Sequence, residues 1–257
     1  MAVHLEMDTN FLVSVITPAY NCQKYIQNCI DSVLRQTYQN WEMIIVDDKS
    51  TDHTAEIAQA SAAKDSRIKV IKQSKNTGAA TARNRAISAA SGRFIAFLDA
   101  DDAWKPNKLE KQIAFMLEHN YAFTFTAYEI HSFLVKGNTK VFHVPHSITY
   151  NQYLKNTIIG NLTVILDRQL MGEITIVKGH LEDVLTWMKY LKMGFTAYGL
   201  NESLAIYRVT KFSISGNKLR NAKRYYHCLR REQKLNLFQS IWCQAGYLFH
   251  AIRKRLF

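Results

Sequence analysis

Two acidic clusters, each placed directly after an apolar run, are the residues of this chain best suited to chemistry. Asp47 and Asp48 follow the segment 42–46, and the cluster Asp99–Asp102 follows the segment 93–98. An apolar run bounded by turn signals is typical of a buried strand in a mostly parallel sheet, and ligands bind at the carboxyl ends of such strands. A buried carboxylate without a partner costs on the order of several kcal/mol. We therefore expect these acids to hold a cation, a sugar hydroxyl or a base N–H.

The second cluster, Asp99-Ala100-Asp101-Asp102, has three carboxylates within four residues. They repel one another unless a positive charge lies among them. An Mg²⁺ or Mn²⁺ ion bound by one or two carboxylates and by substrate phosphates meets that need. One of the three acids could cap the helix expected after Pro106, but the other two would stay unexplained, so the sequence favours a metal and substrate site.

Asp48 precedes Ser50, Thr51 and Asp52, which are residue types that often cap helices. Capping is the simpler interpretation for those three residues. A cap does not require two acids before it, so we assign Asp48 to ligand binding.

The segment 77–84, Thr-Gly-Ala-Ala-Thr-Ala-Arg-Asn, begins another expected helix. The free N–H groups of a helix N-terminus favour phosphate, and Arg83 lies close enough to that end to reach one. A surface ion pair is the alternative for Arg83. The segment has neither G-x-G-x-x-G nor G-x-x-x-x-G-K-[ST], which disfavours a Rossmann dehydrogenase and a P-loop nucleotide hydrolase.

Glu182 and Asp183 form an acidic pair just before an apolar helical pattern. Negative charge at a helix N-terminus is favourable by itself. The residues alone therefore leave this pair open between helix stabilisation and chemistry.

The strands and helices that must position these residues alternate along the first half of the chain. The expected elements are strand 11–17, helix 21–35, strand 41–46, helix 50–64, strand 68–71, helix 77–91, strand 94–98 and helix 106–119. This alternation predicts an α/β fold with a doubly wound, mostly parallel sheet. Beyond residue 120 the pattern is mixed, with expected strands at 121–130, 140–144, 161–166, 195–198 and 204–208 and a helix at 181–193.

In this order the motifs resemble those of the family 2 glycosyltransferases, whose nucleotide-sugar-binding fold is called GT-A. The similar segments are 13–21 (Val-Ser-Val-Ile-Thr-Pro-Ala-Tyr-Asn), 45–52 (Ile-Val-Asp-Asp-Lys-Ser-Thr-Asp), 76–84 (with Asn-Thr-Gly and Ala-Arg-Asn), 97–102 (Phe-Leu-Asp-Ala-Asp-Asp) and 182–183 (Glu-Asp). Five motifs in the right order over residues 11–208 are a specific signal, whereas a lone DxD is not. The residues after 208 lie outside the resemblance.

The resemblance implies a donor site for a nucleotide-diphosphate sugar, with Mg²⁺ or Mn²⁺ as the cofactor. By similarity, Asp48 accepts the uracil N–H, Asp99 contacts the ribose or the sugar, and Asp101 faces the metal. Asp102 shares either of the last two roles. The other residues of the implied donor site are Pro18, Ala19, Tyr20, Gly78, Arg83 and Ala100.

The resemblance also implies an acceptor site with Asp183 as the general base. Asp183 would take a proton from the acceptor hydroxyl as that oxygen attacks the anomeric carbon from the face opposite the leaving group, which inverts the configuration. A positioned base is worth roughly 10²–10⁴-fold. Glu182 is the alternative base or the orienting neighbour of Asp183. One departure is Lys49, where the family usually has glycine.

The expected function is inverting transfer of a sugar from a UDP-hexose or UDP-N-acetylhexosamine donor. The acceptor would be a hydroxyl of a glycan or lipid-linked glycan in cell-surface polysaccharide or lipopolysaccharide biosynthesis. The Gln-x-x-Arg-Trp motif of processive members is absent, which predicts one sugar at a time. The expected GT-A domain covers residues 1–216, with a nucleotide-sugar-binding half at 11–119 and an acceptor half at 120–216.

Two other functional classes stay as alternatives. A metal-dependent nucleotidyltransferase would need a Gly-rich loop with Lys or Arg after the first strand, where the chain has Pro18-Ala-Tyr-Asn21. A basic nucleic-acid-binding protein would leave the strand-end acids without a purpose. We therefore expect no nucleic acid partner, and the sequence leaves homo-oligomerisation open.

The net charge of +12 is concentrated in the tail, residues 217–257, which has ten Lys or Arg and one Glu and leaves +3 for the other 216 residues. The segment 235–252 contains no Asp, Glu, Lys or Arg but has five polar residues, so it is a poor transmembrane span. Its aromatic residues and basic flanks predict an amphipathic helix at a membrane interface. Docking on the protein's own core is the alternative.

The four cysteines have no CxxC spacing, which predicts reduced thiols rather than a zinc site or a disulfide framework. The N-terminus has no basic region followed by an apolar stretch, so no signal peptide is expected. These features predict a cytoplasmic protein that lies peripherally on the inner face of the cell membrane.

Overall fold

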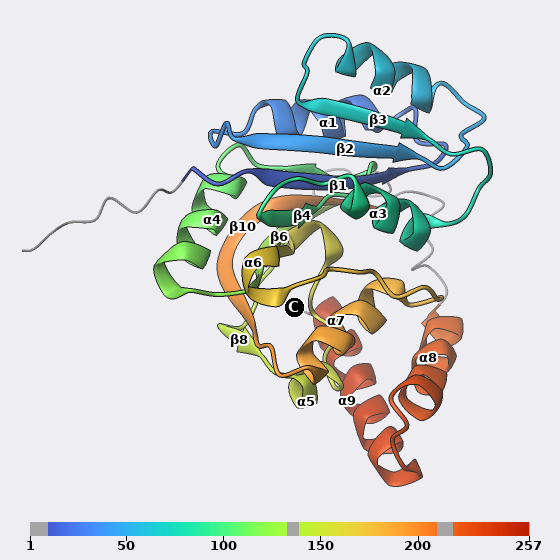
Figure 1. Ribbon diagram of the computed structural model, residues 1–257. Coiled ribbons are helices and arrows are strands. Elements are labelled where there is room, and N and C mark those ends of the chain that lie inside the picture. Colours follow the sequence, from blue (N-terminus) through green and yellow to red (C-terminus); the bar gives the residue numbers. More distant parts are fainter. Residues whose placement is uncertain (1–9, 133–138, 210–217, 257) are drawn as a thin grey trace, which may run out of the picture.

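The computed structural model describes residues 10–132, 139–209 and 218–256, which form a sheet with helices on both faces (Figure 1). The boundary expected between residues 216 and 217 lies outside this part. The strands are β1 (Val13–Ala19), β2 (Trp41–Asp47), β3 (Ile68–Lys72), β4 (Phe94–Phe97), β5 (Ala103–Trp104), β6 (Phe123–Ser132), β7 (Thr139–Phe142), β8 (Ser147–Ile148), β9 (Ile165–Asp167) and β10 (Ala197–Val209).

The strand order is β3-β2-β1-β4-β9-β6-β10-β5, with β7 beside β6 and β8 beside β10. The first four strands pair in parallel, as β3 with β2, β2 with β1, and β1 with β4. β9 is antiparallel to both of its neighbours, and β6 and β10 are parallel to each other. The α/β fold with a mostly parallel first half and a mixed second half is therefore confirmed.

The helices divide between the two faces of this sheet. Their bounds are α1 (Ile26–Leu34), α2 (Thr54–Ala62), α3 (Ala79–Ser88), α4 (Lys108–His119), α5 (Tyr150–Tyr153), α6 (Arg168–Met171), α7 (Glu182–Lys192), α8 (Lys218–His227) and α9 (Leu237–Leu256). One hydrophobic cluster joins the sheet to α1, α2 and α4, and a second joins it to α3, α7 and the C-terminal helices. Because β1, β2 and β4 are buried on both faces, their sequences are mostly apolar instead of alternating between apolar and polar residues.

The first two helices begin later than the sequence predicts. Asn21, expected as the cap of a helix from residue 21, has a left-handed backbone with φ of 47°, and α1 starts at Ile26. The Asn21 side chain instead accepts a hydrogen bond from the Thr51 N–H at 2.8 Å. Asp52, one residue before the N-cap of α2, accepts from the Thr54 N–H at 3.0 Å and from the Gln23 N–H at 3.1 Å. The loops after β1 and β2 therefore brace each other.

Three expected strands in the second half differ from the structure. The segment 161–166 begins with a short 3₁₀ helix, Asn161–Thr163, and only its end belongs to β9. The single strand β10 contains the end of the strand expected at 195–198 and all of the strand expected at 204–208, and it has register shifts after Leu200 and Ser203. The residues between the two expected strands thus belong to one irregular strand.

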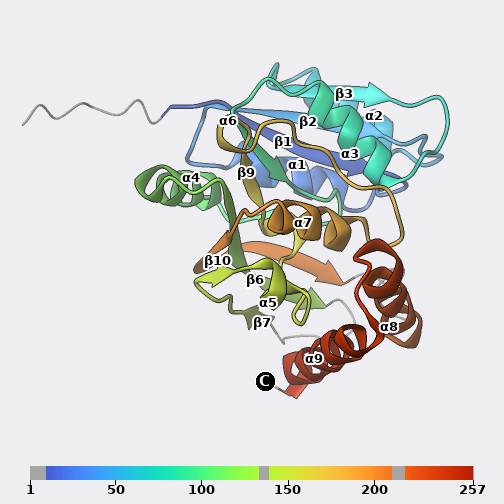
Figure 2. The same cartoon turned by 60° about the horizontal axis from the view of Figure 1, so that its bottom comes forward.

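The C-terminal tail is helical, as predicted. α8 continues into a π-helical segment, Cys228–Glu232, and α9 then packs beside α8. Figure 2 shows α8 and α9 together on the side of the molecule away from β3 and α2. No described helix has a stretch both long enough and apolar enough to cross a membrane.

Candidate active site

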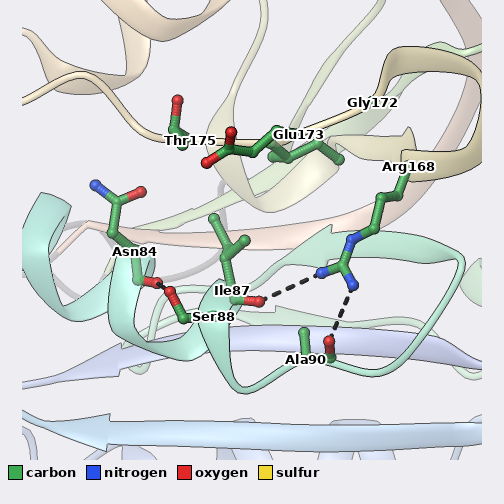
Figure 3. A pocket seen from close by; sticks show the side chains of 9 residues that line it. Asn84, Ile87, Ser88, Ala90, Arg168, Gly172, Glu173 and Thr175 are labelled. Atoms are coloured by element: carbon green, nitrogen blue, oxygen red, sulfur yellow. Dashed lines mark hydrogen bonds between the residues drawn. The ribbon is translucent and has the colours of Figure 1, made fainter.

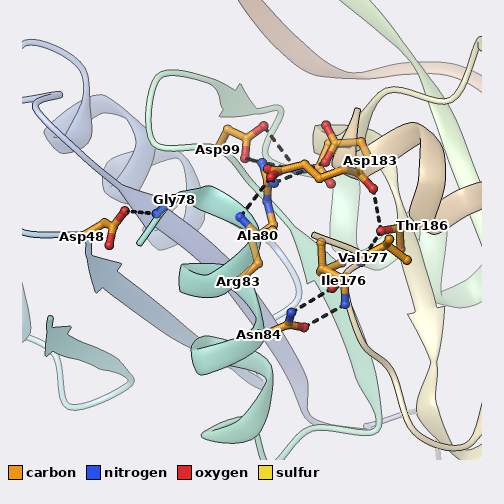
Figure 4. Close-up of polar contacts among 12 residues, drawn as sticks. Asp48, Gly78, Ala80, Arg83, Asn84, Asp99, Ile176, Val177, Asp183 and Thr186 are labelled. Carbon is orange, nitrogen blue, oxygen red and sulfur yellow. Dashed lines mark hydrogen bonds and ion pairs between the residues drawn. The ribbon is translucent and has the colours of Figure 1, made fainter. Parts of the chain in front are cut away.

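A buried arginine with three acidic partners lies between the first half of the chain and the second (Figure 4). Arg83, on the second turn of α3, is only 4 % exposed. Its Nη2 lies 2.6 Å from Asp99 Oδ1, and its Nη1 donates to Glu182 and lies 3.2 Å from Asp183 Oδ1. The surface ion pair considered for Arg83 is therefore wrong, because this ion pair is buried and joins two motifs far apart in the sequence.

Asp48 holds the turn from which α3 starts. Its Oδ1 accepts from the Thr77 N–H at 2.8 Å, the Gln73 side chain at 2.8 Å and the Thr77 hydroxyl at 3.1 Å. Its Oδ2 accepts from the Gly78 N–H at 2.7 Å. Gly78 has φ of 86°, a left-handed conformation that glycine adopts without strain. Asp48 is 3 % exposed, so much of its hydrogen-bonding capacity serves this turn.

The residues expected around the base lie at the ends of β1 and β2. Ala19 pairs with Asp47 across the two strands, and its carbonyl accepts from the Asp48 N–H at 2.8 Å. Pro18 is inside β1 rather than in a turn, and Tyr20 just beyond it is 51 % exposed. These residues adjoin Asp48, and no contact between them and the Arg83 cluster occurs within the described residues.

Asp99 is held from two sides at the end of β4. Arg83 pairs with it from α3, and the Asn161 side-chain amide donates to its Oδ1 at 3.1 Å and its Oδ2 at 3.2 Å. Asn161 is 6 % exposed, and its Oδ1 is buried without a hydrogen-bond partner in the described part of the chain. The sequence reasoning missed Asn161, because an isolated asparagine in an expected strand carries no motif.

Asp101 has no ionic partner among the described residues. Burial raises its pKa to about 6, and the nearby charge of Asp99 acts in the same direction. No group of three or more candidate ligands occurs in the described ranges, so these residues do not form a complete metal cage. Mg²⁺ and Mn²⁺ need only one or two carboxylates when phosphates supply further oxygens. The carboxylate of Asp101 therefore fits a cation that binds together with a diphosphate.

Asp102 is turned into the protein instead. It is 1 % exposed, and its Oδ1 accepts from the Arg208 N–H at 2.9 Å. The Arg208 side chain donates to the backbone carbonyls of Asp101 and Asp102 at 3.4 Å each. Asp102 and the buried Ala100 therefore attach the acidic motif to β10 and the core, which disfavours the metal role predicted for Asp102.

Glu182 and Asp183, at the start of α7, differ in how tightly they are held. Glu182 pairs with Arg83 and also accepts from the Ala80 N–H at 3.2 Å, so it closes the first turn of α3. Asp183 keeps a side-chain exposure of 37 %, although its Oδ1 is covered by the protein. Burial raises the pKa of Asp183 to about 6, with Asp99 and Glu182 adding to the rise and Arg83 opposing it. Asp183 is therefore the more exposed acid of the pair, since the side chain of Glu182 is 22 % exposed.

The sequence pattern of the family described as "Glycosyl transferase family 2" matches residues 14–172. The chain belongs to this family. The family resemblance and the GT-A-type fold expected from the motifs are thereby confirmed. This glycosyltransferase is also similar over nearly its whole length to proteins with more specific names.

TuaG of Bacillus subtilis, provisionally named a teichuronic acid biosynthesis glycosyltransferase, is 48 % identical over 95 % of this chain and 98 % of its own. The Escherichia coli protein WfgD, named UDP-Glc:alpha-D-GlcNAc-diphosphoundecaprenol beta-1,3-glucosyltransferase, is 42 % identical over 96 % of both chains. The mannosyltransferase PcManGT from Pyrobaculum calidifontis, solved with GDP-Man and Mn²⁺, has a TM-score of 0.69 and 18 % identity, covering 92 % of this chain and 69 % of its own. At that identity the likeness shows the fold alone.

The segment before α7 of the glycosyltransferase is also fixed to α3. The Asn84 side chain donates to the Ile176 carbonyl and accepts from the Ile176 N–H, both at 2.8 Å. Val177 N–H in turn donates to the Thr186 hydroxyl at 2.9 Å. Adjacent residues of one motif, Arg83 and Asn84, therefore hold the acids at the start of α7 and the segment that leads to them.

A separate cavity of about 490 Å³ lies beside the C-terminal half of α3 (Figure 3). Its lining includes Asn84, Glu173 and Arg168, and Arg168 donates to the carbonyls of Ile87 and Ala90. None of the clustered acids lines this cavity. The acids selected from the sequence are therefore at the Arg83 cluster and the strand ends, not in this cavity.

Proposed function

We propose that this glycosyltransferase moves one sugar from a UDP-sugar to a hydroxyl of a diphosphate-lipid-linked glycan in surface-polysaccharide biosynthesis. A UDP-hexose or UDP-N-acetylhexosamine is the donor class, and UDP-glucose is the first candidate. The name of WfgD, which gives UDP-Glc as donor and a diphosphoundecaprenol-linked sugar as acceptor, supports this choice. The name of TuaG supports a role in cell-surface polymer synthesis.

The observation that carries the proposal is the shared guanidinium of Arg83. It contacts Asp99, at the end of a donor-side strand, and Asp183, at the start of the acceptor-side helix. A group transfer requires the donor and the acceptor to be held close together in the right orientation. A single buried cation that joins the two sides keeps both sets of acids in one geometry.

Asp183 acts as the general base in this proposal. A carboxylate whose pKa is raised to about 6 is ionised at neutral pH and more basic than an ordinary aspartate. It accepts the proton of the acceptor hydroxyl while that oxygen attacks the anomeric carbon, and UDP leaves from the opposite face. Glu182, which is tied to Arg83 and the Ala80 N–H, orients this site instead of acting as base.

Inversion of configuration is the stereochemical part of the proposal. The sugar of UDP-glucose is α-linked to its diphosphate, and the name of WfgD describes a β-1,3 product. A single displacement by an acceptor hydroxyl produces that change. The placement of one base, Asp183, on the acceptor side supports the same course.

A divalent cation, Mg²⁺ or Mn²⁺, belongs to the proposed donor site, with Asp101 as its protein ligand. Such an ion, held by Asp101, would neutralise charge on the departing diphosphate. The support from this chain is a half-buried carboxylate that has a raised pKa and forms no ion pair in the described residues. Asp102, bonded to the Arg208 N–H, positions Asp101 rather than binding the ion.

The nucleotide lies across the ends of β1 and β2 in this proposal. Asp48 Oδ2 accepts a single hydrogen bond, from the Gly78 N–H, so it retains capacity to accept the N–H of uracil. Pro18, Ala19 and the exposed Tyr20 line the base and ribose.

The test is transfer from a panel of UDP-sugars to a synthetic α-GlcNAc-diphosphoryl lipid with Mn²⁺ or Mg²⁺ present. We expect UDP formation to depend on the acceptor, and proton NMR to show a β linkage for a glucose product. Asp65→Asn, a carboxylate in an ion pair with Arg67 away from the site, is the matched control for Asp183→Asn. An α-linked product, or full activity of Asp183→Asn, would contradict the mechanism. Activity only with a nucleoside triphosphate and a sugar phosphate would indicate a nucleotidyltransferase instead.

A further inference from the structure

Most of the large apolar side chains exposed on this protein lie on one helix. The described residues include ten such side chains, and six of them belong to α9. They are Leu237 (58 % exposed), Phe238 (80 %), Ile241 (56 %), Trp242 (61 %), Leu248 (43 %) and Phe249 (62 %). A soluble surface rarely gathers such residues in one contiguous patch unless something binds there.

These six residues form one face of α9, here called the outward face. At about 100° per residue they fall within an arc of roughly 140°. The opposite side contains Ser240 and Cys243, which are 0 % and 5 % exposed, and the half-buried Tyr247. α9 therefore has two apolar faces, and only one of them is covered by the protein.

Specific contacts hold the inward side of α9 against the rest of the chain. The Gln244 side chain donates to the Ala222 carbonyl of α8 at 3.2 Å, and the rings of Tyr225 and Tyr247 stack with centroids 4.3 Å apart. The Tyr225 hydroxyl then donates to the Leu154 carbonyl at 2.7 Å. Docking on the core and binding at an interface, which the sequence leaves as alternatives, thus belong to opposite faces of the same helix.

Basic residues precede and follow the outward face along the chain. Arg230, Arg231 and Lys234 are exposed just before α9, and the sequence has three more basic residues at 253–255. Aromatic and aliphatic side chains bracketed by cations match the interface of an anionic bilayer, where headgroups carry negative charge above an apolar layer. We infer that the outward face of α9 binds an anionic lipid surface.

This contact would place the acceptor side of the enzyme toward the bilayer. Tyr225, Cys228 and Cys243 of the tail share a hydrophobic cluster with Trp187 and Met188 of α7, the helix that begins with the acids of the site. Cys228 Sγ lies 4.0 Å from Met188 Sδ of α7. The lipid contact does not depend on the proposed function, and only its use in reaching a lipid-linked acceptor rests on it.

The experiment uses the full-length protein with vesicles of phosphatidylglycerol and phosphatidylethanolamine. Three of the four tryptophans, Trp41, Trp104 and Trp187, are at most 3 % exposed, so Trp242 is the fluorophore that can meet lipid. We expect the protein to sediment with the vesicles, its fluorescence to shift to the blue, and brominated lipids to quench it. Phosphatidylcholine vesicles or 0.5 M salt (roughly a fourfold shorter screening range than dilute buffer) should weaken all three signals.

The variant Phe238→Gln with Phe249→Gln removes two outward side chains and keeps the fluorophore. We expect it to reduce partitioning into vesicles about tenfold or more, because the apolar area that can be buried falls. The matched control is Met193→Gln with Leu170→Gln, which removes two exposed apolar side chains outside α9 (60 % and 39 %). The control should bind vesicles as the unaltered protein does.

Three results would overturn the inference. The first is that the protein does not bind anionic vesicles, and the second is that the variant and the control lose vesicle binding equally. The third is a lipid-independent dimer that the α9 variant abolishes, which would mean that a second copy of the chain covers the outward face. Transfer to a detergent-dispersed acceptor is measured in parallel. Transfer without vesicle binding rejects only this inference, whereas vesicle binding without transfer rejects only the proposed function.

Discussion

The surroundings of Asp48 and of Arg83 show two different ways to hold acids at the ends of buried parallel strands. Asp48 is a single carboxylate with four neutral donors, two of them backbone N–H groups of the turn before α3. Around Arg83 three carboxylates share a single guanidinium. In sequence, Asp48 and Asp99 look alike, because each follows an apolar strand.

The two regions differ in their charge balance. The carboxylate of Asp48 is well compensated by hydrogen bonds, so it can stabilise the fold whether or not a ligand is present. Burial raises the pKa of Asp183 and of the adjacent Asp101, and the excess negative charge of the Arg83 cluster adds to that rise. The first region should therefore respond to substitution mainly in stability, and the second mainly in activity.

Asp183→Asn should have the largest effect on catalysis. Loss of the base should lower kcat by roughly 10²–10⁴-fold while the KM for the donor changes little. The pKa of Asp183 is raised in the folded state, so its ionisation disfavours folding above pH 6. The variant should therefore unfold at an equal or higher temperature at pH 7.5, with a smaller difference at pH 5. Steady-state kinetics and thermal unfolding at both pH values measure this, and a stability loss comparable to the activity loss would break the comparison.

Asp48→Asn should act in the opposite way. The new amide can still accept from Thr77, but its NH₂ group would face the Gly78 N–H, so one hydrogen bond is replaced by two opposed donors. We expect the free energy of unfolding to fall by about 1–3 kcal/mol.

Urea unfolding and titration calorimetry with UDP together decide the role of Asp48. Weaker UDP binding at unchanged stability would make Asp48 a base contact alone and remove the contrast with the Arg83 cluster. Reduced stability with unchanged UDP affinity would make it purely structural. The proposal requires both quantities to fall.

Much of the fold could be predicted from local patterns. The strands β1 to β4 are apolar runs with turn residues between them, and the helices between them follow the same alternation. The remaining features of the fold depend on tertiary contacts. The bend of Asn21 toward Thr51, and the joining of 195–208 into one irregular strand, depend on neighbours that no sequence window contains.

The candidate site divides in the same way. Asp99, Glu182, Asp183 and Arg83 could each be selected from motifs, but the pairing of Arg83 with the three acids could not, because Arg83 is 99 residues from Glu182 along the chain. The inward orientation of Asp102 could not be predicted either, since it depends on a hydrogen bond from the Arg208 N–H of β10. Asn161 contacts Asp99 across 62 residues and belongs to no predicted motif.

The pH dependence of kcat/KM should show the raised pKa of Asp183 directly. Because the base must be ionised, activity should fall about tenfold per pH unit below a pKa of about 6. Above that value the acid limb should be flat.

Asp101 also has a pKa raised to about 6, so the metal concentration must be varied in the same experiment. Protons compete with a cation for Asp101, and a limb that moves to lower pH with more Mn²⁺ would belong to that residue. A limb that does not move belongs to Asp183. A limb near pH 4 would mean that neither carboxylate is perturbed and would contradict the contrast with Asp48.

Asn161→Ala should have the smallest effect on activity. It separates the contribution of Asn161 from that of Arg83, because both hold Asp99. It removes the amide that donates to both oxygens of Asp99, while Arg83 still holds Oδ1. We expect roughly a fivefold rise in the KM for the donor, a kcat within about twofold, and a loss of about 1 kcal/mol in unfolding free energy. Donor-saturation kinetics and urea unfolding measure these values. A large fall in kcat with unchanged KM would show that Asn161 acts on the transferred group, not on the position of Asp99, and that its buried, unpartnered Oδ1 contacts the substrate.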